Sequence, residues 1–185
     1  KLAGVICIED PLREEAEAVV NSLKRAGITK VVMMTGDSER TAAAIAKRVG
    51  VDEYYSEVLP EDKAGFIEKE KAAGRKVIMI GDGINDSPAL SAANVGIAIS
   101  DGAEIAREIA DITVGSDDLY QIVTLKLLSD SLMKRIRGNY RFIVSFNLGL
   151  ILCGVAGILR PTTSALLHNT STLLISLKSM QNLLD

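Results

Sequence analysis

The sequence predicts an α/β fold, in which a parallel sheet carries helices on both faces, followed by a transmembrane helical hairpin. Three observations predict it. Short β-branched runs alternate with amphipathic stretches, as in parallel sheets built from strand–helix units. Charged residues, 24% of the 185, are almost absent from the last quarter of the chain. Polar residues also follow directly after several of the expected strands, where open α/β sheets place their ligands.

The expected elements alternate regularly along the chain. The apolar runs predict strands at residues 5–8, 30–34, 52–58, 77–80, 95–99 and 112–114. Helices are expected at residues 11–26, 39–49 and 60–73, then from residues 88 and 103, and a long helix from residue 119. Gly27, Gly50 and Gly74 stand where three of these helices should stop. Ser87 and Pro88 are expected to cap and open the helix that follows the fourth strand.

Two uncharged stretches predict the hairpin. Residues 142–159 are 18 residues without a charge, the lower length for a membrane-spanning helix. A second, more polar stretch follows Arg160 and Pro161 and reaches Lys178. Basic residues before the first stretch put residues 1–137 in the cytoplasm by the positive-inside rule. The alternative is a pair of buried helices in a large soluble domain.

The net charge and the cysteine count argue against several classes of function. A net charge of −3 gives no support for nucleic-acid binding. Two cysteines, Cys7 and Cys153, are too few for a disulfide framework or a zinc site. The chain opens on Lys1 and leads straight into a strand, so we expect a fragment of a longer polypeptide.

Polar groups after three strands predict a phosphoryl-transfer site. Thr35-Gly36-Asp37 follows one strand, Lys63 opens the next helix, and the run GDGIND places Asp82 and Asp86 after a buried strand. A hydroxyl and an ammonium suit a phosphoryl group, and paired carboxylates suit Mg²⁺. Taken singly, each has a plainer reading, such as an Asp-Gly turn, a helix cap or a solvated lysine.

These motifs resemble the second, third and fourth motifs of the haloacid-dehalogenase superfamily, in the version found in P-type ATPases. The runs MMTGDSERTAAAIAKRVGV and MIGDGINDSPALSAANVGIAI carry the resemblance, which extends over essentially the whole chain. It implies a haloacid-dehalogenase-like Rossmannoid sheet. A closing pair of membrane helices is typical of the heavy-metal-transporting branch.

The resemblance implies a role for each motif residue. Asp82 would coordinate Mg²⁺, with Asp86 shaping that site and Asn85 bonding to the phosphorylated site. Thr35 would contact the aspartyl phosphate and Lys63 would neutralise it. Gly36 and Asp37 would lie in the loop that meets the actuator domain, and Gly81 and Gly83 would give the backbone clearance.

One departure from the family limits the expected activity. The nucleophile motif Asp-Lys-Thr-Gly-Thr does not occur in the sequence. ATP would be bound mainly by a nucleotide-binding domain that is missing, as is the actuator domain, so the chain alone is expected to be inactive. Two alternatives stay open: a membrane-tethered phosphatase of the superfamily, and a non-catalytic module that binds Mg²⁺ or phosphate.

The polar residues of the hairpin are candidate ligands for the transported ion. Polar groups inside a bilayer are costly, and they commonly mark a functional site. The candidates are Asn147, His168, Asn169 and Thr172. Imidazole and amide groups suit a borderline divalent ion such as Zn²⁺ or Mn²⁺. The alternative is that His168 and Asn169 bond to neighbouring helices.

The expected organisation is therefore a phosphorylation domain at residues 1–118, a linking helix at 119–137 and two transmembrane helices at 138–185. The expected partners are a transition-metal cation, membrane lipid and the missing domains of the same polypeptide. We expect a multi-pass protein of the cell membrane.

Overall fold

The computed structural model describes residues 12–81, 84–99, 108–115 and 118–183. It divides into two compact units, Lys1–Val123 and Thr124–Asp185. Each unit is described by itself.

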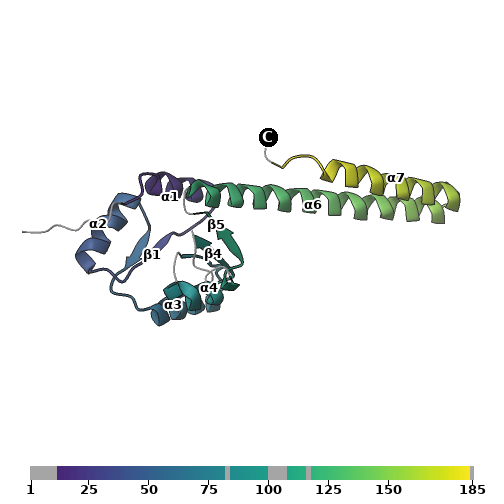
Figure 1. Ribbon diagram of the computed structural model, residues 1–185. Coiled ribbons are helices and arrows are strands. Elements are labelled where there is room, and N and C mark those ends of the chain that lie inside the picture. The colour runs from purple at the N-terminus through teal and green to yellow at the C-terminus, as the bar shows by residue number, and fades with distance from the viewer. Residues whose placement is uncertain (1–11, 82–83, 100–107, 116–117, 184–185) are drawn as a thin grey trace, which may run out of the picture. The chain divides into compact units, whose positions relative to one another are not determined.

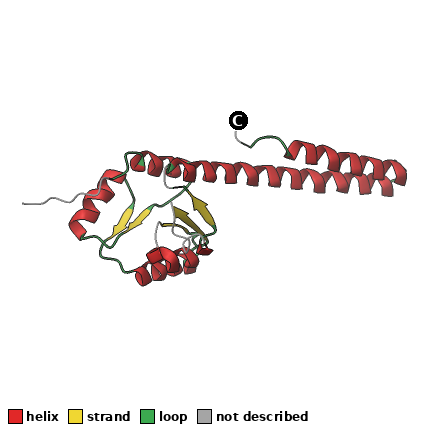
Figure 2. Ribbon diagram, in the orientation of Figure 1, coloured by secondary structure: helices red, strands yellow, loops and turns green. Residues whose placement is uncertain are grey.

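The first unit is an α/β arrangement with helices on both sides of its strands (Figures 1 and 2). Its elements, in chain order, are α1 (Ala16–Arg25), β1 (Val32–Met34), α2 (Glu39–Val49), β2 (Glu53–Tyr55), α3 (Pro60–Ala72), β3 (Ile78–Gly81), a 3₁₀ turn (Ile84–Asp86), α4 (Ser87–Ala92), β4 (Val95–Ile99) and β5 (Ile112–Val114). The expected strand at residues 5–8 lies outside the described residues, as does the start of the helix expected from residue 103.

All strand pairs are parallel, as predicted, but the described strands form two sheets. β1 pairs with β2, with Met33 opposite Tyr54. The second sheet has the order β3-β4-β5, with Ile80 opposite Ile97 and Ala98 opposite Thr113. The alternation of runs along the chain identifies strands, but it does not say which strands are neighbours.

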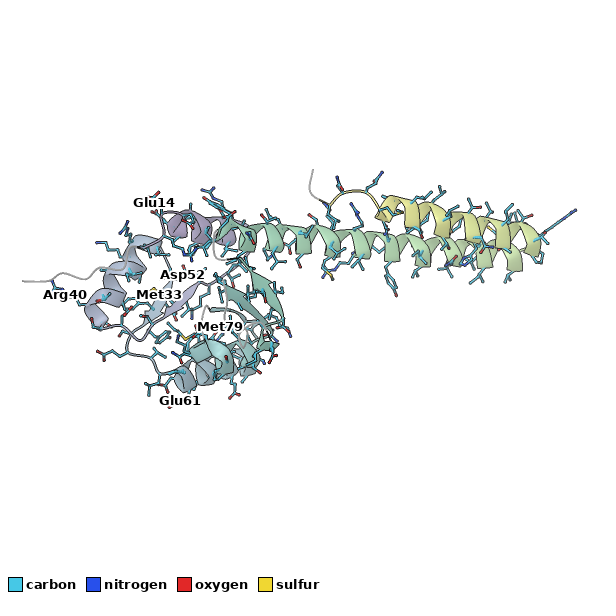
Figure 3. The ribbon with its side chains drawn as sticks, viewed as in Figure 1. Glu14, Met33, Arg40, Asp52, Glu61 and Met79 are labelled. Carbon is cyan, nitrogen blue, oxygen red and sulfur yellow. The ribbon has the colours of Figure 1, made fainter. Side chains whose placement is uncertain are left out.

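The hydrophobic core lies where α3 and α4 cover the second sheet. Its buried cluster consists of Ile67, Met79, Ala89, Leu90 and Ala98. Met34, the last residue of β1, packs against this cluster, so both sheets contribute to one core. Figure 3 shows Met79 pointing into the interior, with Glu14, Arg40 and Glu61 at the rim of the unit. Burying a side chain such as that of Leu90 contributes about 1.5–3 kcal/mol.

Glycines end the helices where the sequence predicts. Gly27, Gly50 and Gly74 have φ values of +96°, +77° and +82°, a left-handed conformation that costs glycine little. The predicted cap at Ser87 is wrong by one residue. The 3₁₀ turn runs directly into α4, so Asp86 is the N-cap and Ser87 is the first helical residue.

The second unit is an antiparallel helical hairpin. It contains α7 (Pro161–Ser179) and most of α6 (Tyr120–Val155). The two helices run in opposite directions. Asn139 of α6 bonds to Ser179 at the end of α7, and the later residue Asn147 bonds to the earlier residue His168. α6 ends at Val155, four residues before the predicted end at residue 159. Gly157 takes φ +72°, and the Ile158 N–H donates to the Cys153 carbonyl, which closes the helix.

One basic residue, Arg135, joins the two helices at one end of the hairpin. The Arg135 guanidinium on α6 donates to the backbone carbonyls of Ser179, Gln181 and Asn182 at the end of α7. The last carbonyls of a helix lack partners within the helix, so this contact satisfies groups that would otherwise need water.

One described helix, α6, is long and apolar enough to cross a membrane. Its most apolar 18-residue window has a mean hydropathy of 1.2 and is almost entirely uncovered by the described chain. Charge-free length alone predicted two spans. The more polar α7 does not reach the same hydropathy, so the second span stays a prediction.

Candidate functional site

The loop after β1 is held in shape by its own polar groups. The Thr35 hydroxyl donates to the Asp37 carboxylate at 2.8 Å and accepts from the Asp37 N–H at 3.1 Å. The Thr35 N–H donates to the Tyr55 carbonyl at 3.0 Å, which extends the β1–β2 pairing by one residue. The three predicted residues Thr35, Gly36 and Asp37 therefore form one ordered turn at the end of a strand.

Glu39 anchors this loop to the end of β2, and the sequence analysis did not identify it. Its carboxylate accepts from the Tyr54 hydroxyl at 2.7 Å and from the Ser56 hydroxyl at 2.6 Å. The Ser56 hydrogen bond, followed by that of Tyr54, lowers the pKa of Glu39. The one signal in the sequence is the acidic residue in the first turn of α2, which the helix dipole also favours.

Glu57 was also missed, and it has an unusual backbone conformation. Its φ of +53° is the only positive value at a described residue other than glycine. The Glu57 N–H donates to the Asp37 carbonyl at 2.9 Å, and the Val58 N–H donates to the Thr35 carbonyl at 3.0 Å. A left-handed residue that is not glycine costs about 1–2 kcal/mol, so the two loops are held together against a local penalty.

An ion pair joins the other two motifs. The Lys63 ammonium in the first turn of α3 lies 2.7 Å from the Asp86 carboxylate in the 3₁₀ turn after β3. The side chains are 15% and 13% exposed, so the pair is largely shielded from water. The sequence predicted both residues for one site. It did not indicate that they would contact each other, because they lie 23 positions apart.

Gly81 leaves the space that Asp86 occupies. A Cβ atom at residue 81 would lie 2.7 Å from both the Cβ and an oxygen of Asp86, which is too close for any side chain. The close neighbour of residue 81 is therefore Asp86, and the clearance role of Gly81 toward a ligand stays a prediction. The Ser87 hydroxyl nearby is buried and has no hydrogen-bond partner among the described residues.

The remaining motif residues are only partly described. Asn85 lies on the 3₁₀ turn with an exposed side chain. Asp82 and Gly83, a predicted Mg²⁺ ligand and a clearance residue, lie outside the described residues. The structure thus brings Lys63, Gly81 and Asp86 together, and separately joins residues 35–37 to residues 57–58.

The described residues are compatible with a magnesium site, though they do not complete one. They contain no group of three or more His, Cys, Asp or Glu side chains that could hold a metal. Mg²⁺ needs less than that, because it is usually held by one or two carboxylates with water and phosphate oxygens. Asp86 supplies one buried carboxylate, and the orphaned Ser87 hydroxyl is a second oxygen beside it in the sequence.

The four candidate polar residues of the hairpin differ in their hydrogen-bond partners. His168 Nδ1 lies 2.8 Å from the Asn147 side-chain oxygen, across the two helices. The Thr172 hydroxyl donates to the His168 carbonyl at 3.1 Å within α7. Asn169 is exposed and lies one position further around the helix. The structure therefore joins the side chains of two of the four candidates, Asn147 and His168, whereas Thr172 contacts only the backbone carbonyl of His168.

The α/β unit places the chain in a known class. Residues 1–94 match the family model of the haloacid dehalogenase-like hydrolases, and the chain belongs to that family.

Individual proteins similar to this chain point to a narrower class than the family model does. A manganese-exporting P-type ATPase of Mycobacterium bovis is 39% identical over 94% of this chain, and a copper-transporting ATPase of Rhizobium meliloti is 43% identical over 90%. The chain spans only 24% and 20% of these two relatives. A crystal structure of a zinc-transporting PIB-type ATPase superposes with a TM-score of 0.86 and 32% identity, covering 96% of this chain and 29% of that one.

Proposed function

We propose that the chain is part of an ATP-driven metal-cation pump that cycles through an aspartyl phosphate. One observation carries this proposal: the likeness to the zinc-transporting ATPase covers 96% of the chain, so it includes the hairpin as well as the α/β unit. A free-standing phosphatase would account for the α/β unit alone. The transported ion is a transition metal, because the relatives are named for manganese and copper and the solved structure for zinc.

In this proposal the chain supplies the surroundings of the phosphoryl group. The Thr35 hydroxyl turns from Asp37 to donate to a phosphoryl oxygen, and Lys63 keeps one of its three N–H donors on Asp86 while the others neutralise developing charge. Asn85 adds a hydrogen bond to the phosphorylated site. Gly36 and Asp37 form the surface that meets the actuator domain during dephosphorylation.

Mg²⁺ would be held by Asp82 and Asp86, and when bound it neutralises the oxygens of the phosphoryl group. The aspartate nucleophile and most ATP contacts come from parts of a longer polypeptide, so this chain alone does not turn over ATP. The hairpin supplies two membrane helices, with residues 1–137 in the cytoplasm of a multi-pass protein of the cell membrane.

The test is phosphoenzyme formation in the full-length polypeptide. Asp82→Asn removes one carboxylate of the proposed Mg²⁺ site, and we expect labelling from γ-³²P-ATP to fall by about 10²-fold or more. The matched control is Asp52→Asn, which makes the same change from carboxylate to amide at an aspartate that pairs with Lys24 at 2.6 Å and is not one of the proposed site residues. Normal labelling in Asp82→Asn would rule out the proposed role of this residue.

A further inference from the structure

A groove lies between the two helices of the second unit, near the start of the charge-free stretch of α6. Its volume is about 750 Å³, within the range of about 300–1,000 Å³ that is typical of ligand pockets. Arg135 and Asn139, which line it, bond to residues at the end of α7 and so join the two helices. Gly138 keeps the groove open, because a Cβ atom at this residue would meet nothing within 4 Å.

The lining changes from basic to apolar along the groove. Lys134 and Arg135 of α6 and Lys178 of α7 form its basic end. The apolar lining residues are Phe142, Phe146, Leu167, Leu174 and Ile175. Phe142 and Leu174 are 51% and 61% exposed, so the described chain leaves much of this apolar surface uncovered.

The basic end of the groove lacks a counter-charge. The Arg135 guanidinium is occupied by backbone carbonyls at the end of α7. The ammonium groups of Lys134 and Lys178, in contrast, take part in no hydrogen bond or ion pair within the described part of the chain. No acidic residue lines the groove, and Asp130, the one acidic residue of α6, pairs with Lys126. Two ammonium groups on one groove without an acid between them attract an anion.

The length of the groove matches one leaflet of a bilayer. Phe146 follows Lys134 by twelve positions on α6, which is a rise of about 18 Å along an α-helix. Half the hydrocarbon thickness of a bilayer is about 15 Å. Phe142 and Phe146 lie inside the charge-free residues 142–159, whereas Lys134 lies before them. A molecule that fills the groove therefore needs an anionic head at the membrane surface and an apolar part below it.

We propose that the groove binds one anionic phospholipid of the cytoplasmic leaflet. Its phosphate lies between Lys134 and Lys178, and an acyl chain lies along Phe142 and Phe146, whose rings stack with centroids 5.5 Å apart. The inference rests on the membrane topology in the proposed function, and it adds a ligand that takes no part in phosphoryl transfer or ion binding. A free phosphate would leave the apolar surface bare, and a further membrane helix would bury two uncompensated ammonium groups, which is costly.

The composition of the chain provides a direct reporter for this lipid. The chain contains no tryptophan, so Phe146→Trp places a single fluorescent side chain in the groove. The full chain is reconstituted in phosphatidylcholine vesicles with an increasing mole fraction of phosphatidylglycerol whose brominated acyl chains quench tryptophan. Brominated phosphatidylcholine is compared over the same range. We expect half-maximal quenching at a mole fraction about 10-fold lower for the anionic lipid, because each basic residue at the surface strengthens its binding.

Two further reporters check the position. Phe142→Trp repeats the measurement from a second residue of the groove and should show the same preference. Leu152→Trp is the matched control, because Leu152 is also on α6, is 60% exposed and does not line the groove. It should be quenched equally by the two lipids, since it faces the bulk of the bilayer.

Two double variants separate the groove from the general attraction of a basic surface. Lys134→Gln with Lys178→Gln removes both proposed phosphate contacts and should abolish most of the preference of about 10-fold. Arg137→Gln with Arg141→Gln removes the same charge from the same end of the hairpin. Both arginines are exposed and neither lines the groove, so this variant should retain the preference.

Filling the groove tests the place of the acyl chain. Gly138→Leu adds a side chain inside the groove, and it should bring the quenching of the Phe146→Trp reporter by phosphatidylglycerol close to that by phosphatidylcholine. The matched control is Gly149→Leu, because a Cβ atom at residue 149 also meets nothing within 4 Å but the residue does not line the groove. This control should keep the preference.

The outcomes of these measurements divide clearly. Equal quenching of the Phe146→Trp reporter by both lipids, or an equal loss in the two double variants, would overturn the inference. So would loss of the preference in the full-length polypeptide with any other tryptophan replaced by phenylalanine, since another segment would then cover the groove. Failure of the inference is distinct from failure of the proposed function. Phosphoenzyme labelling that requires Asp82, in a polypeptide without any lipid preference, would reject the lipid site and leave the pump assignment in place.

Discussion

Two lysine–aspartate pairs with nearly the same length lie in very different surroundings. Lys63 and Asp86 are 2.7 Å apart and mostly buried, whereas Lys24 and Asp52 are 2.6 Å apart with side chains 30% and 38% exposed. Removing one partner of a buried pair leaves a charge without water or a counter-ion, while an exposed partner is resolvated. The stabilising effect of the two contacts therefore differs although their geometry does not.

We expect Lys63→Met to lower the free energy of unfolding of the α/β unit by about 3 kcal/mol, and Lys24→Met by less than about 1 kcal/mol. The double variant Lys63→Met with Asp86→Asn should cost less than Lys63→Met alone, because no charge is left buried. Hydrogen exchange of the β3 and α3 amides measures all three. Equal losses in the two single variants would mean that Asp86 gains water once Lys63 is removed.

At the scale of elements, Asp52 joins three segments of the first unit. Its carboxylate accepts from Lys24 of α1 and from the Val31 N–H before β1, and the residue itself precedes β2. The Lys24 hydrogen bond, followed by that of Val31, lowers the pKa of Asp52. A carboxylate whose pKa is lowered by folding stabilises the fold above its unfolded pKa, and loses this effect as the pH falls through its folded pKa.

We therefore expect the difference in unfolding free energy between the unaltered chain and Asp52→Asn to shrink as the pH falls below about 4. Chemical denaturation from pH 7 to pH 3, followed by circular dichroism, gives this difference at each pH. Stability curves that stay parallel over the whole range would show that the Lys24 and Val31 contacts do not survive in solution.

The sequence predicts those elements whose ends depend on local chemistry. α2 and β4 lie at the predicted bounds, Glu39–Val49 and Val95–Ile99, because a glycine stop and a short β-branched run are local signals. The end of α6 was misplaced because apolar residues continue past Gly157, whose left-handed turn depends on the backbone. Strand pairing was not predictable either, since partners such as Ile97 and Ile112 meet only in the folded sheet.

The candidate site likewise has a part that the sequence predicts and a part that it does not. Local motifs predicted Thr35, Lys63 and Asp86 as site residues, from their residue types and from their places at the ends of strands or the start of a helix. The contacts that hold them, such as Lys63 to Asp86 and Asn147 to His168, join residues more than 20 positions apart. No pattern along the chain encodes which of the polar residues will meet, so local motifs predict candidate residues but not the bonds between them.

At the scale of the whole molecule, the order of charged and apolar segments predicts a membrane topology. Residues 1–137 carry almost all the charged side chains. Arg160 is the only charged residue in the turn between α6 and α7. If both helices span the bilayer, this turn lies on the side opposite the α/β unit. The proposal is thereby open to a direct test in cells.

The test places a single cysteine in the first turn of α7, directly after this turn, as Thr162→Cys, in a chain whose Cys7 and Cys153 are replaced by serine. We expect an impermeant maleimide to label it in intact cells. The control is Asn21→Cys at an exposed residue of α1, which should be labelled only after the cells are opened. Labelling of both sites from outside, or of neither before lysis, would exclude the hairpin topology.

The strands of each sheet lie close together in the sequence, and this has a consequence for folding during synthesis. β1 and β2 come from a short continuous stretch, and β3, β4 and β5 all come from residues 78–114. Because short loops close at little entropic cost, both sheets can pair while the chain is still emerging from the ribosome. A polypeptide made in this order completes the described strands before the apolar part of α6 has been translated, so folding of the unit need not await insertion into the membrane.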